Sequence, residues 1–260
     1  MGEGDPLGCA ECTRRANLPA VIPPERVPEL VPDEQIPGDD LADLCGHAGL
    51  PGSRGEHLLQ CAYGTTERAR RFYNDQVLDW LNPAMIEFIG RMELLFVATA
   101  DARGECDASL RAGPAGFIRV LDPHQLAYPE YRGNGVLASL GNITENGHVG
   151  LLMVDFVTDL IGLHVNGSAR VVDDHGLRRW HPGLPVEPDR GRVPERWVLV
   201  EVQEAYVHCR KHIPRMVPVS RDRAWGTDDA RRKGGDYFEA KATNKRWRPP
   251  EHLTSPVGQN

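Results

Sequence analysis

The chain from residue 94 to residue 209 alternates short hydrophobic runs with glycine, asparagine, aspartate and proline. Runs of this kind, bounded by turn-forming residues, are typical of β-strands. The pattern predicts seven strands, at 94–100, 106–112, 117–122, 125–131, 148–156, 160–172 and 197–209. A helix over 135–145 is expected between the fourth and the fifth strand. Short strands joined by tight turns favour a closed or split antiparallel β-barrel.

Two helices are expected before the first strand. Thr65 or Thr66 can cap a helix whose apolar residues recur at spacings of three to five, at Ala69, Phe72, Val77, Leu78 and Leu81. Asn82 followed by Pro83 predicts the start of a second helix, because asparagine is a good N-cap and proline is favoured at the first helical position. The buried stripe of this second helix is expected at Met85, Phe88 and Ile89. Order should begin near residue 65, and both helices are interpreted as structural.

The hydrophobic periodicity is absent from the N-terminal part of the chain. Residues 1–56 hold eight of the 21 prolines, so this part should be extended or poorly ordered. Residues 1–60 carry eleven Asp and Glu against four Lys and Arg, which accounts for the whole net charge of −7. We therefore divide the chain into an acidic, Pro-rich leader at 1–60, a barrel domain at 61–215 and an irregular, mildly basic tail at 216–260. The tail contains one short helix expected near 228–242.

Composition narrows the function classes. A mean hydropathy of −0.42, with no apolar run of transmembrane length and no hydrophobic signal region, indicates a cytoplasmic protein without a membrane partner. No uniformly basic stripe is visible, so nucleic acid is not an expected partner. The cysteines and histidines of the first 61 residues could be assembled into a zinc site, at Cys9, Cys12, Cys45, His47, His57 and Cys61. Their spacing is irregular, so reduced thiols are the preferred interpretation and no metal is assigned.

The stretch "YPEYRGNGVLASLGN" (128–142) combines several features of an anion site. Gly133 and Gly135 permit positive φ and close backbone approach, and Asn134 tolerates the same geometry. The helix that follows presents free amides and the positive end of its dipole. Arg132 adds a cation and Ser139 a hydroxyl. Together these groups predict a receptor for a phosphate group.

The neighbouring strands strengthen this prediction. Ser109 and Arg111 alternate along the strand at 106–112, and Tyr128 and Tyr131 flank the strand that leads into the turn. A second arginine on an adjacent strand would give a doubly charged phosphate two positive partners. The pattern therefore indicates a ligand that carries a phosphate group.

The order of these motifs resembles a known family. The chain reads D-x-S-x-R, then G-F-I-R-V-L-D, then Y-R-G-N, then S-L-G-N-I-T-E-N and V-G-L-L. This order resembles the pyridoxamine 5′-phosphate oxidase-like family of the FMN-binding split-barrel superfamily, over residues 85–172 and more weakly over 195–215. The resemblance implies a mainly β (α+β) fold, an antiparallel split β-barrel with flanking helices and here a Pro-rich N-terminal extension. It also implies a homodimer that binds FMN at the subunit interface.

The resemblance further implies roles for individual residues. Ser109 and Arg111 would hold the flavin, and Tyr128, Pro129 and Tyr131 would line its ring and ribityl edge. The phosphate would be bound by Arg132, Gly133, Asn134 and Ser139. Asn142 would support these ligands, and Lys211 would approach from the segment "HCRKHIPR" (208–215), often from the other subunit.

The function implied is that of an FMN-dependent oxidoreductase, which transfers a hydride between the flavin and a small substrate. No catalytic residue is assigned, because the flavin itself carries this chemistry. Residues 173–196 and 215–260 do not match the substrate-phosphate loop and C-terminal segment of true pyridoxamine phosphate oxidases, so vitamin biosynthesis is not expected. The alternatives are non-catalytic binding or sensing of flavin, deazaflavin or haem, and a zinc-dependent interaction module.

Overall fold

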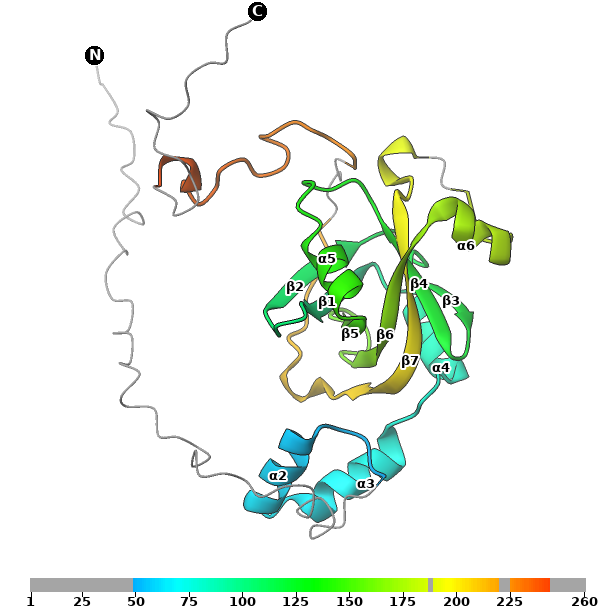
Figure 1. Ribbon diagram of the computed structural model, residues 1–260, viewed down its shortest axis with the longest axis vertical. Coiled ribbons are helices and arrows are strands. Elements are labelled where there is room, and N and C mark those ends of the chain that lie inside the picture. Colours follow the sequence, from blue (N-terminus) through cyan, green and yellow to red (C-terminus); the bar gives the residue numbers. More distant parts are fainter. Residues whose placement is uncertain (1–48, 187–188, 220–224, 244–260) are drawn as a thin grey trace, which may run out of the picture.

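A computed structural model describes residues 49–186, 189–219 and 225–243 (Figure 1). Most of the predicted leader lies outside these residues, including Cys9, Cys12, Cys45 and His47. These are four of the six residues from which a zinc site could be assembled. Cys61 is disulfide-bonded, which differs from the reduced thiol expected at this position.

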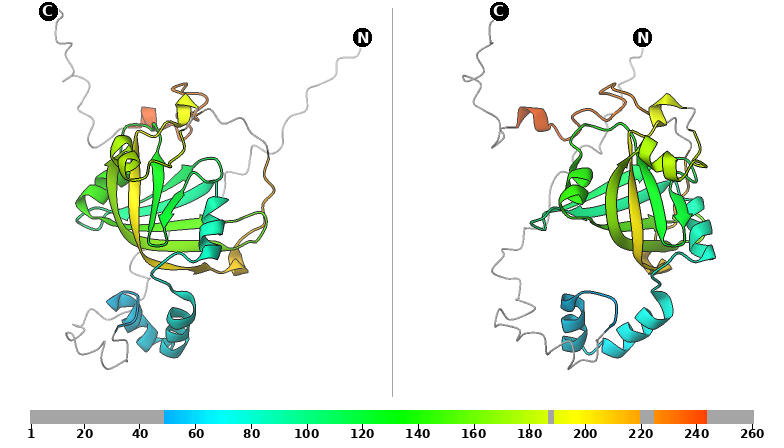
Figure 2. Two further views of the ribbon diagram at one scale, coloured as in Figure 1. Left: turned by 90° about the vertical axis from the view of Figure 1, so that its right-hand side faces the viewer. Right: turned by 45° about the vertical axis from the view of Figure 1, so that its right-hand side comes forward.

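Seven strands form one antiparallel sheet in the order β2-β1-β5-β6-β7-β4-β3. They are β1 Leu94–Ala100, β2 Cys106–Ala112, β3 Arg119–Asp122, β4 Gln125–Glu130, β5 His148–Val154, β6 Gly162–Asp173 and β7 Arg196–His208. All seven predicted strands are confirmed, with ends that differ by two residues at most. The sheet is strongly curved, so that its strands wrap around a common interior (Figures 1 and 2).

The interior follows from the alternation of side chains along each strand. In β1, Leu95, Val97 and Thr99 are buried while Phe96 is 40% exposed. The same alternation buries every second residue of β5. The core thus lies on one side of β1 and β5, and their other side remains partly exposed.

Helix α4 (Pro83–Gly90) agrees with its prediction in detail. The Asn82 side chain accepts a hydrogen bond from the Met85 amide at 3.0 Å, and Pro83 occupies the first turn. Phe88 and Ile89 are buried in the core. The Asn-Pro pair therefore positions α4 so that its apolar residues pack into the barrel.

Helix α3 (Thr66–Gln76) starts where it was predicted but is shorter. Thr65 precedes it without a side-chain capping bond, and none of its residues is buried. Val77 is already extended, and Leu78 pairs with Ala205 of β7. The expected continuation of the helix to Leu81 is therefore wrong, because this stretch joins the sheet instead.

Two helices were not predicted. Helix α2 (Arg54–Ala62) crosses the expected leader boundary at residue 60 and begins with a capping box, in which Ser53 and Glu56 bond to each other's amides. Helix α6 (Asp174–Trp180) lies between the strands expected at 160–172 and 197–209, and Asp173 caps it by accepting from the Gly176 amide. Helix α5 (Ala138–Glu145) is confirmed but starts three residues late. The helix expected near 228–242 is wrong, because the only helical turn described there is the 3₁₀ turn Ala240–Ala242.

Candidate functional site

A chain of hydrogen bonds joins β2 to β4 and α5 at one end of the barrel. The Ser139 hydroxyl donates to the Asp107 carboxylate at 2.9 Å and lies 2.9 Å from the Ser109 hydroxyl. Arg111 donates to Ser109 at 2.9 Å and to Glu130 at 2.7 Å. Three of the predicted site residues, Ser109, Arg111 and Ser139, are thus brought together by direct contact.

Ser139 has a different role from the one expected. Its side chain belongs to a residue that is only 3% exposed, and its hydroxyl is already used by Asp107 and Ser109. A phosphate would meet a carboxylate at this position rather than a free hydroxyl. Ser139 therefore ties α5 to β2 and does not offer its hydroxyl to an anion.

Arg111 and Glu130 form a half-buried ion pair. The Nε–Oε1 distance is 2.7 Å, and the two side chains are 19% and 13% exposed. Burial raises the pKa of the Glu130 carboxyl, and the Arg111 guanidinium opposes this rise. Arg111 is therefore held in a fixed position, with part of its charge already balanced.

Positive φ angles occur in the glycine-rich turn at one of the two predicted glycines and at one residue that was not predicted. Gly135 has φ 82°, and Leu137 has φ 58° at the N-cap of α5. Asn134 accepts from the Val136 amide at 3.0 Å, which closes the turn. Leu137 provides no capping side chain, so the first amides of α5 are left for another acceptor. A left-handed leucine is rare, and no local sequence pattern predicts it here.

Arg132, Gly133 and Asn134 line a cavity of about 400 Å³ together with Ala112 of β2. The remaining wall is a C-terminal segment, at Trp225, Gly226, Thr227, Asp228 and Lys233. Arg132 pairs with Asp228 at 2.8 Å, and both side chains are well exposed, at 60% and 66%. Sequence reasoning missed this wall, because the tail was read only as irregular.

Pro129 and Tyr131 face a separate cavity of about 260 Å³, which Phe117 and Trp197 also line. The Tyr131 ring meets the Trp225 ring edge to face, with centroids 5.8 Å apart. These contacts connect the strand that leads into the turn with the same C-terminal segment. Tyr131 has surface available for a ring-shaped ligand, whereas Pro129 lies in the buried part of β4.

Tyr128 does not share this surface. It has no exposed area and belongs to the hydrophobic core, and its hydroxyl is buried without a hydrogen-bond partner among the described residues. Burial raises the pKa of this hydroxyl far above its ordinary value. The predicted contact between Tyr128 and a flavin is therefore not possible in this conformation.

The orphan hydroxyl leads to a prediction. Replacing Tyr128 by phenylalanine should raise the free energy of unfolding by about 1 kcal/mol, because it removes a buried polar atom that bonds to nothing. Chemical denaturation would measure the change, with Tyr63→Phe as a control at a residue that is 58% exposed. A loss of stability in Y128F would mean that the hydroxyl has a partner in solution.

The last two predicted residues lie outside the cluster. The Asn142 amide donates to the Thr99 hydroxyl at 3.0 Å and so fixes α5 to β1. Lys211 lies in the exposed 3₁₀ turn Arg210–His212, just after β7 ends. Lys211 is not among the residues that line the cavities next to the turn before α5.

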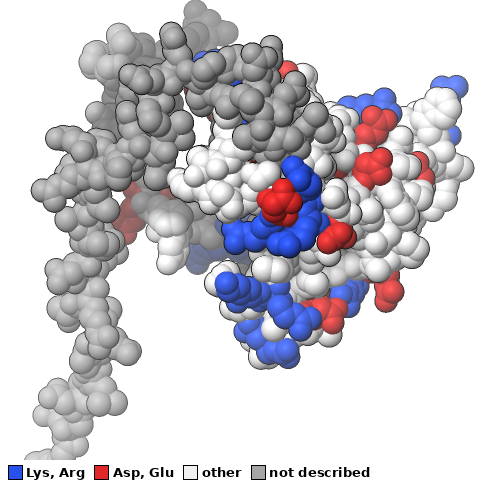
Figure 3. All heavy atoms as spheres, turned by 90° about the horizontal axis from the view of Figure 1, so that it is seen from below, with Lys and Arg blue, Asp and Glu red and all other residues white. Residues whose placement is uncertain are grey.

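Charged side chains of both signs lie on the face near α2 and α3 (Figure 3). Basic groups lie there with acidic ones between them, and Arg70 pairs with Glu67 at 2.7 Å. In the described part of the chain, no helix is long and apolar enough to cross a membrane. Nor do three His, Cys, Asp or Glu side chains gather there as a metal site would require.

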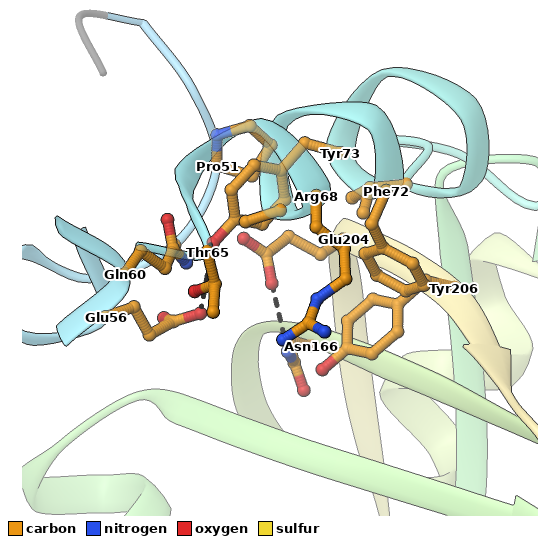
Figure 4. Close-up of a pocket in the computed structure, with 13 residues that line it drawn as sticks. Pro51, Glu56, Gln60, Thr65, Arg68, Phe72, Tyr73, Asn166, Glu204 and Tyr206 are labelled. Atoms are coloured by element: carbon orange, nitrogen blue, oxygen red, sulfur yellow. Dashed lines mark hydrogen bonds between the residues drawn. The ribbon is translucent and has the colours of Figure 1, made fainter. Parts of the chain in front are cut away.

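A further cavity of about 580 Å³ lies between α2, α3 and the strands β6 and β7 (Figure 4). Glu204 accepts from Asn166 at 3.0 Å, and Arg68 reaches from α3 toward them. None of the eleven predicted site residues lines this cavity. We therefore place the candidate site at the turn before α5, where Arg132 lines a cavity and the helix begins without a capping side chain.

The chain is similar to several solved structures at low sequence identity. None of the curated proteins compared matches the chain. Similar solved structures include HupZ of Group A Streptococcus (23% identity, 48% of this chain, 90% of that chain, TM-score 0.35). A Lactobacillus delbrueckii protein named after pyridoxamine 5′-phosphate oxidase has 24% identity, with 50% and 98% covered and a TM-score of 0.37. HutZ, the heme storage protein from Vibrio cholerae, has 16% identity, with 49% and 93% covered and a TM-score of 0.33.

The barrel itself carries the family match. Residues 81–209 match the family model for pyridoxamine 5′-phosphate oxidase, a range that begins just before α4 and ends after β7. The glycine-rich turn before α5 and the hydrogen-bond network around Ser109 both fall inside this range. Through these residues, the chain belongs to the pyridoxamine 5′-phosphate oxidase-like family and has its FMN-binding split-barrel fold.

Proposed function

We propose that this protein is an FMN-dependent oxidoreductase that transfers a hydride between its flavin and a small-molecule substrate. The observation that carries the proposal is the turn before α5. There, Arg132, Gly133 and Asn134 line one cavity at the end of β2, a few residues before α5 begins without a capping side chain. Guanidinium groups and helix N-terminal amides are the groups that proteins use for phosphate.

The donor set fits a phosphate, but it is smaller than the one expected. Arg132, Gly133 and Asn134 line the cavity, whereas Ser139 is bonded to Asp107. Tyr131 offers apolar surface nearby for the ring system, and Pro129 lines the same cavity from the buried part of β4. FMN, when bound, supplies the hydride chemistry, and these residues bind and orient it.

A homodimer is part of the proposal, with the flavin at the subunit interface. One row of residues crosses five neighbouring strands on the outer face of the sheet, and cross-strand pairing places its members side by side: Leu110, Phe96, Leu152, His164 and Tyr206. Leu110 is 52% exposed and Phe96 is 40% exposed. A contiguous apolar face of this kind supports a protein partner, and a second copy of the chain is the partner we propose.

The proposed location is the cytoplasm, where FMN and small reducible substrates are both present. The disulfide at Cys61 counts against this location, because disulfides are rare in cytoplasmic proteins. Thiol titration of protein purified without reductant would show whether that bond forms.

Two measurements test the proposed function. The absorption spectrum of the purified protein, after incubation with FMN and removal of free cofactor, should show the flavin doublet. A Soret band or the single band of a deazaflavin would instead support the binding or sensing alternatives. Turnover with NADH or NADPH, with oxygen as the acceptor, would then establish whether the bound flavin is reduced and reoxidised.

Replacing Phe96 by glutamate tests the interface. A carboxylate within this row should weaken dimerisation by roughly tenfold or more and lower flavin occupancy with it. Light scattering coupled to gel filtration would report the mass, and Phe238→Glu is the control because Phe238 is 88% exposed and lies outside the sheet. A wild-type monomer, or an F96E monomer that keeps its flavin, would contradict a flavin shared between two subunits.

A further inference from the structure

The C-terminal segment is seated on the barrel by close backbone contact. The Trp225 ring lies against the Tyr131 ring, and the Arg192 guanidinium lies 5.7 Å from its centroid. A Cβ atom added at Gly191 would come within 2.6 Å of the Trp225 carbonyl oxygen. At Gly226, where φ is +63°, an added Cβ would come within 2.8 Å of the Gly191 Cα. Two glycines thus allow the segment to pack directly on the loop before β7.

The C-terminal segment places charged side chains next to the turn before α5. Asp228 places its carboxylate on Arg132 at 2.8 Å. Lys233 lines the same cavity, and it forms no ion pair within the described ranges. A carboxylate and a phosphate compete for the same guanidinium donors. Asp228 therefore occupies the position at which the proposed phosphate would bind Arg132.

We infer that residues Trp225–Lys233 form the outer wall of the phosphate site, in which Lys233 is a second cation for the phosphate and Asp228 is displaced from Arg132 on binding. This inference rests on the proposed function, because it assigns further residues to the same site. The ligand class is a phosphate monoester, the end group of FMN. Both members of the Arg132–Asp228 pair are mostly exposed, and exposed ion pairs are weak, so a dianion can replace the carboxylate.

The proposed wall predicts opposite changes in FMN affinity for two substitutions. Asp228→Asn removes the internal competitor, so FMN should bind more tightly, by roughly two- to sixfold. Lys233→Gln removes a cation, so FMN should bind more weakly, by roughly three- to tenfold. Glu239→Gln is the matched control, because it removes one negative charge from the same segment at an exposed residue away from the cavity.

The experiment is a titration of the full-length chain with FMN, followed by quenching of flavin fluorescence, for the wild type and the three variants. Inorganic phosphate is added as a competitor, which separates recognition of the phosphate group from recognition of the ring. Phosphate should compete better in D228N and worse in K233Q than in the wild type. Thermal unfolding of each variant confirms that the fold is kept.

Two results would overturn the inference in different ways. If D228N and K233Q bind FMN as the E239Q control does, while Arg132→Ala loses it, the wall plays no part in binding and the proposed function stands. If the wild type does not bind FMN, the proposed function fails, and titration with inorganic phosphate alone decides on the wall. Equal phosphate affinity in D228N and E239Q would then show that Asp228 does not compete with phosphate, and would reject the proposed wall.

Discussion

Replacing Arg132 by alanine is expected to remove most of the flavin from the purified protein while the fold stays intact. The guanidinium is 60% exposed and its ion pair is with Asp228 on the C-terminal segment, so the barrel does not depend on it. A hydrogen bond to a charged group contributes about 1.5 to 3 kcal/mol, which corresponds to a roughly ten- to hundredfold weaker affinity for FMN. The ratio of flavin to protein absorbance after purification measures this loss.

Arg179→Ala is the matched control for this experiment. Arg179 is an exposed arginine on α6, away from the cavity that contains Arg132, and its removal changes the net charge equally. R179A should keep its flavin and its melting temperature. Full flavin occupancy in R132A would place the phosphate elsewhere and remove the main support for the site.

The second large effect concerns stability. Gly167 lies at the register shift between β6 and β7, and a Cβ atom added there would overlap the Glu201 carbonyl oxygen and lie 2.9 Å from its carbon. Both strands are in the middle of the sheet and cannot separate without losing ladder hydrogen bonds. Gly167→Ala should therefore lower the free energy of unfolding by about 3 kcal/mol or more, measured by chemical denaturation.

Gly90→Ala provides the comparison. Gly90 ends α4, and an added Cβ atom would meet nothing within 4 Å, so the change in stability should stay within about 0.5 kcal/mol. If G167A proved as stable as G90A, the two long strands would have to pack less closely at their register shift than the structure shows.

Local sequence signals were sufficient for the sheet and for one helix. Alternation of apolar and polar residues located β1 and β2 to the residue, and the Asn82-Pro83 pair located α4. Helix α2 was missed although Ser53 and Glu56 form a recognisable capping box, because the surrounding prolines outweighed it. Helix α6 has the weaker signal of a single Asp173 cap.

The site was predicted in part, and the missing part comes from long-range contacts. The turn and Arg132 are consecutive in sequence, so local geometry could indicate them. The carboxylates that pair with Ser139, Arg111 and Arg132 come from other segments, at Asp107, Glu130 and Asp228. No local sequence pattern indicates with which hydroxyl or guanidinium group each of these carboxylates will pair. Tyr128 was assigned to a ligand through the family resemblance, and no local pattern shows that both faces of β4 are buried.

The position of β7 in the sheet order has a consequence for how the chain folds. β7 lies between β6 and β4, so backbone pairing in the sheet links the β3–β4 hairpin to the other four strands only through β7. During synthesis, β4 emerges about 70 residues before its partner, and its edge stays open until then. Pairing across such separations is slow because loop closure must come first. The edge of β4 therefore stays open to other strands until β7 has paired with it, which raises the risk of aggregation while the chain folds.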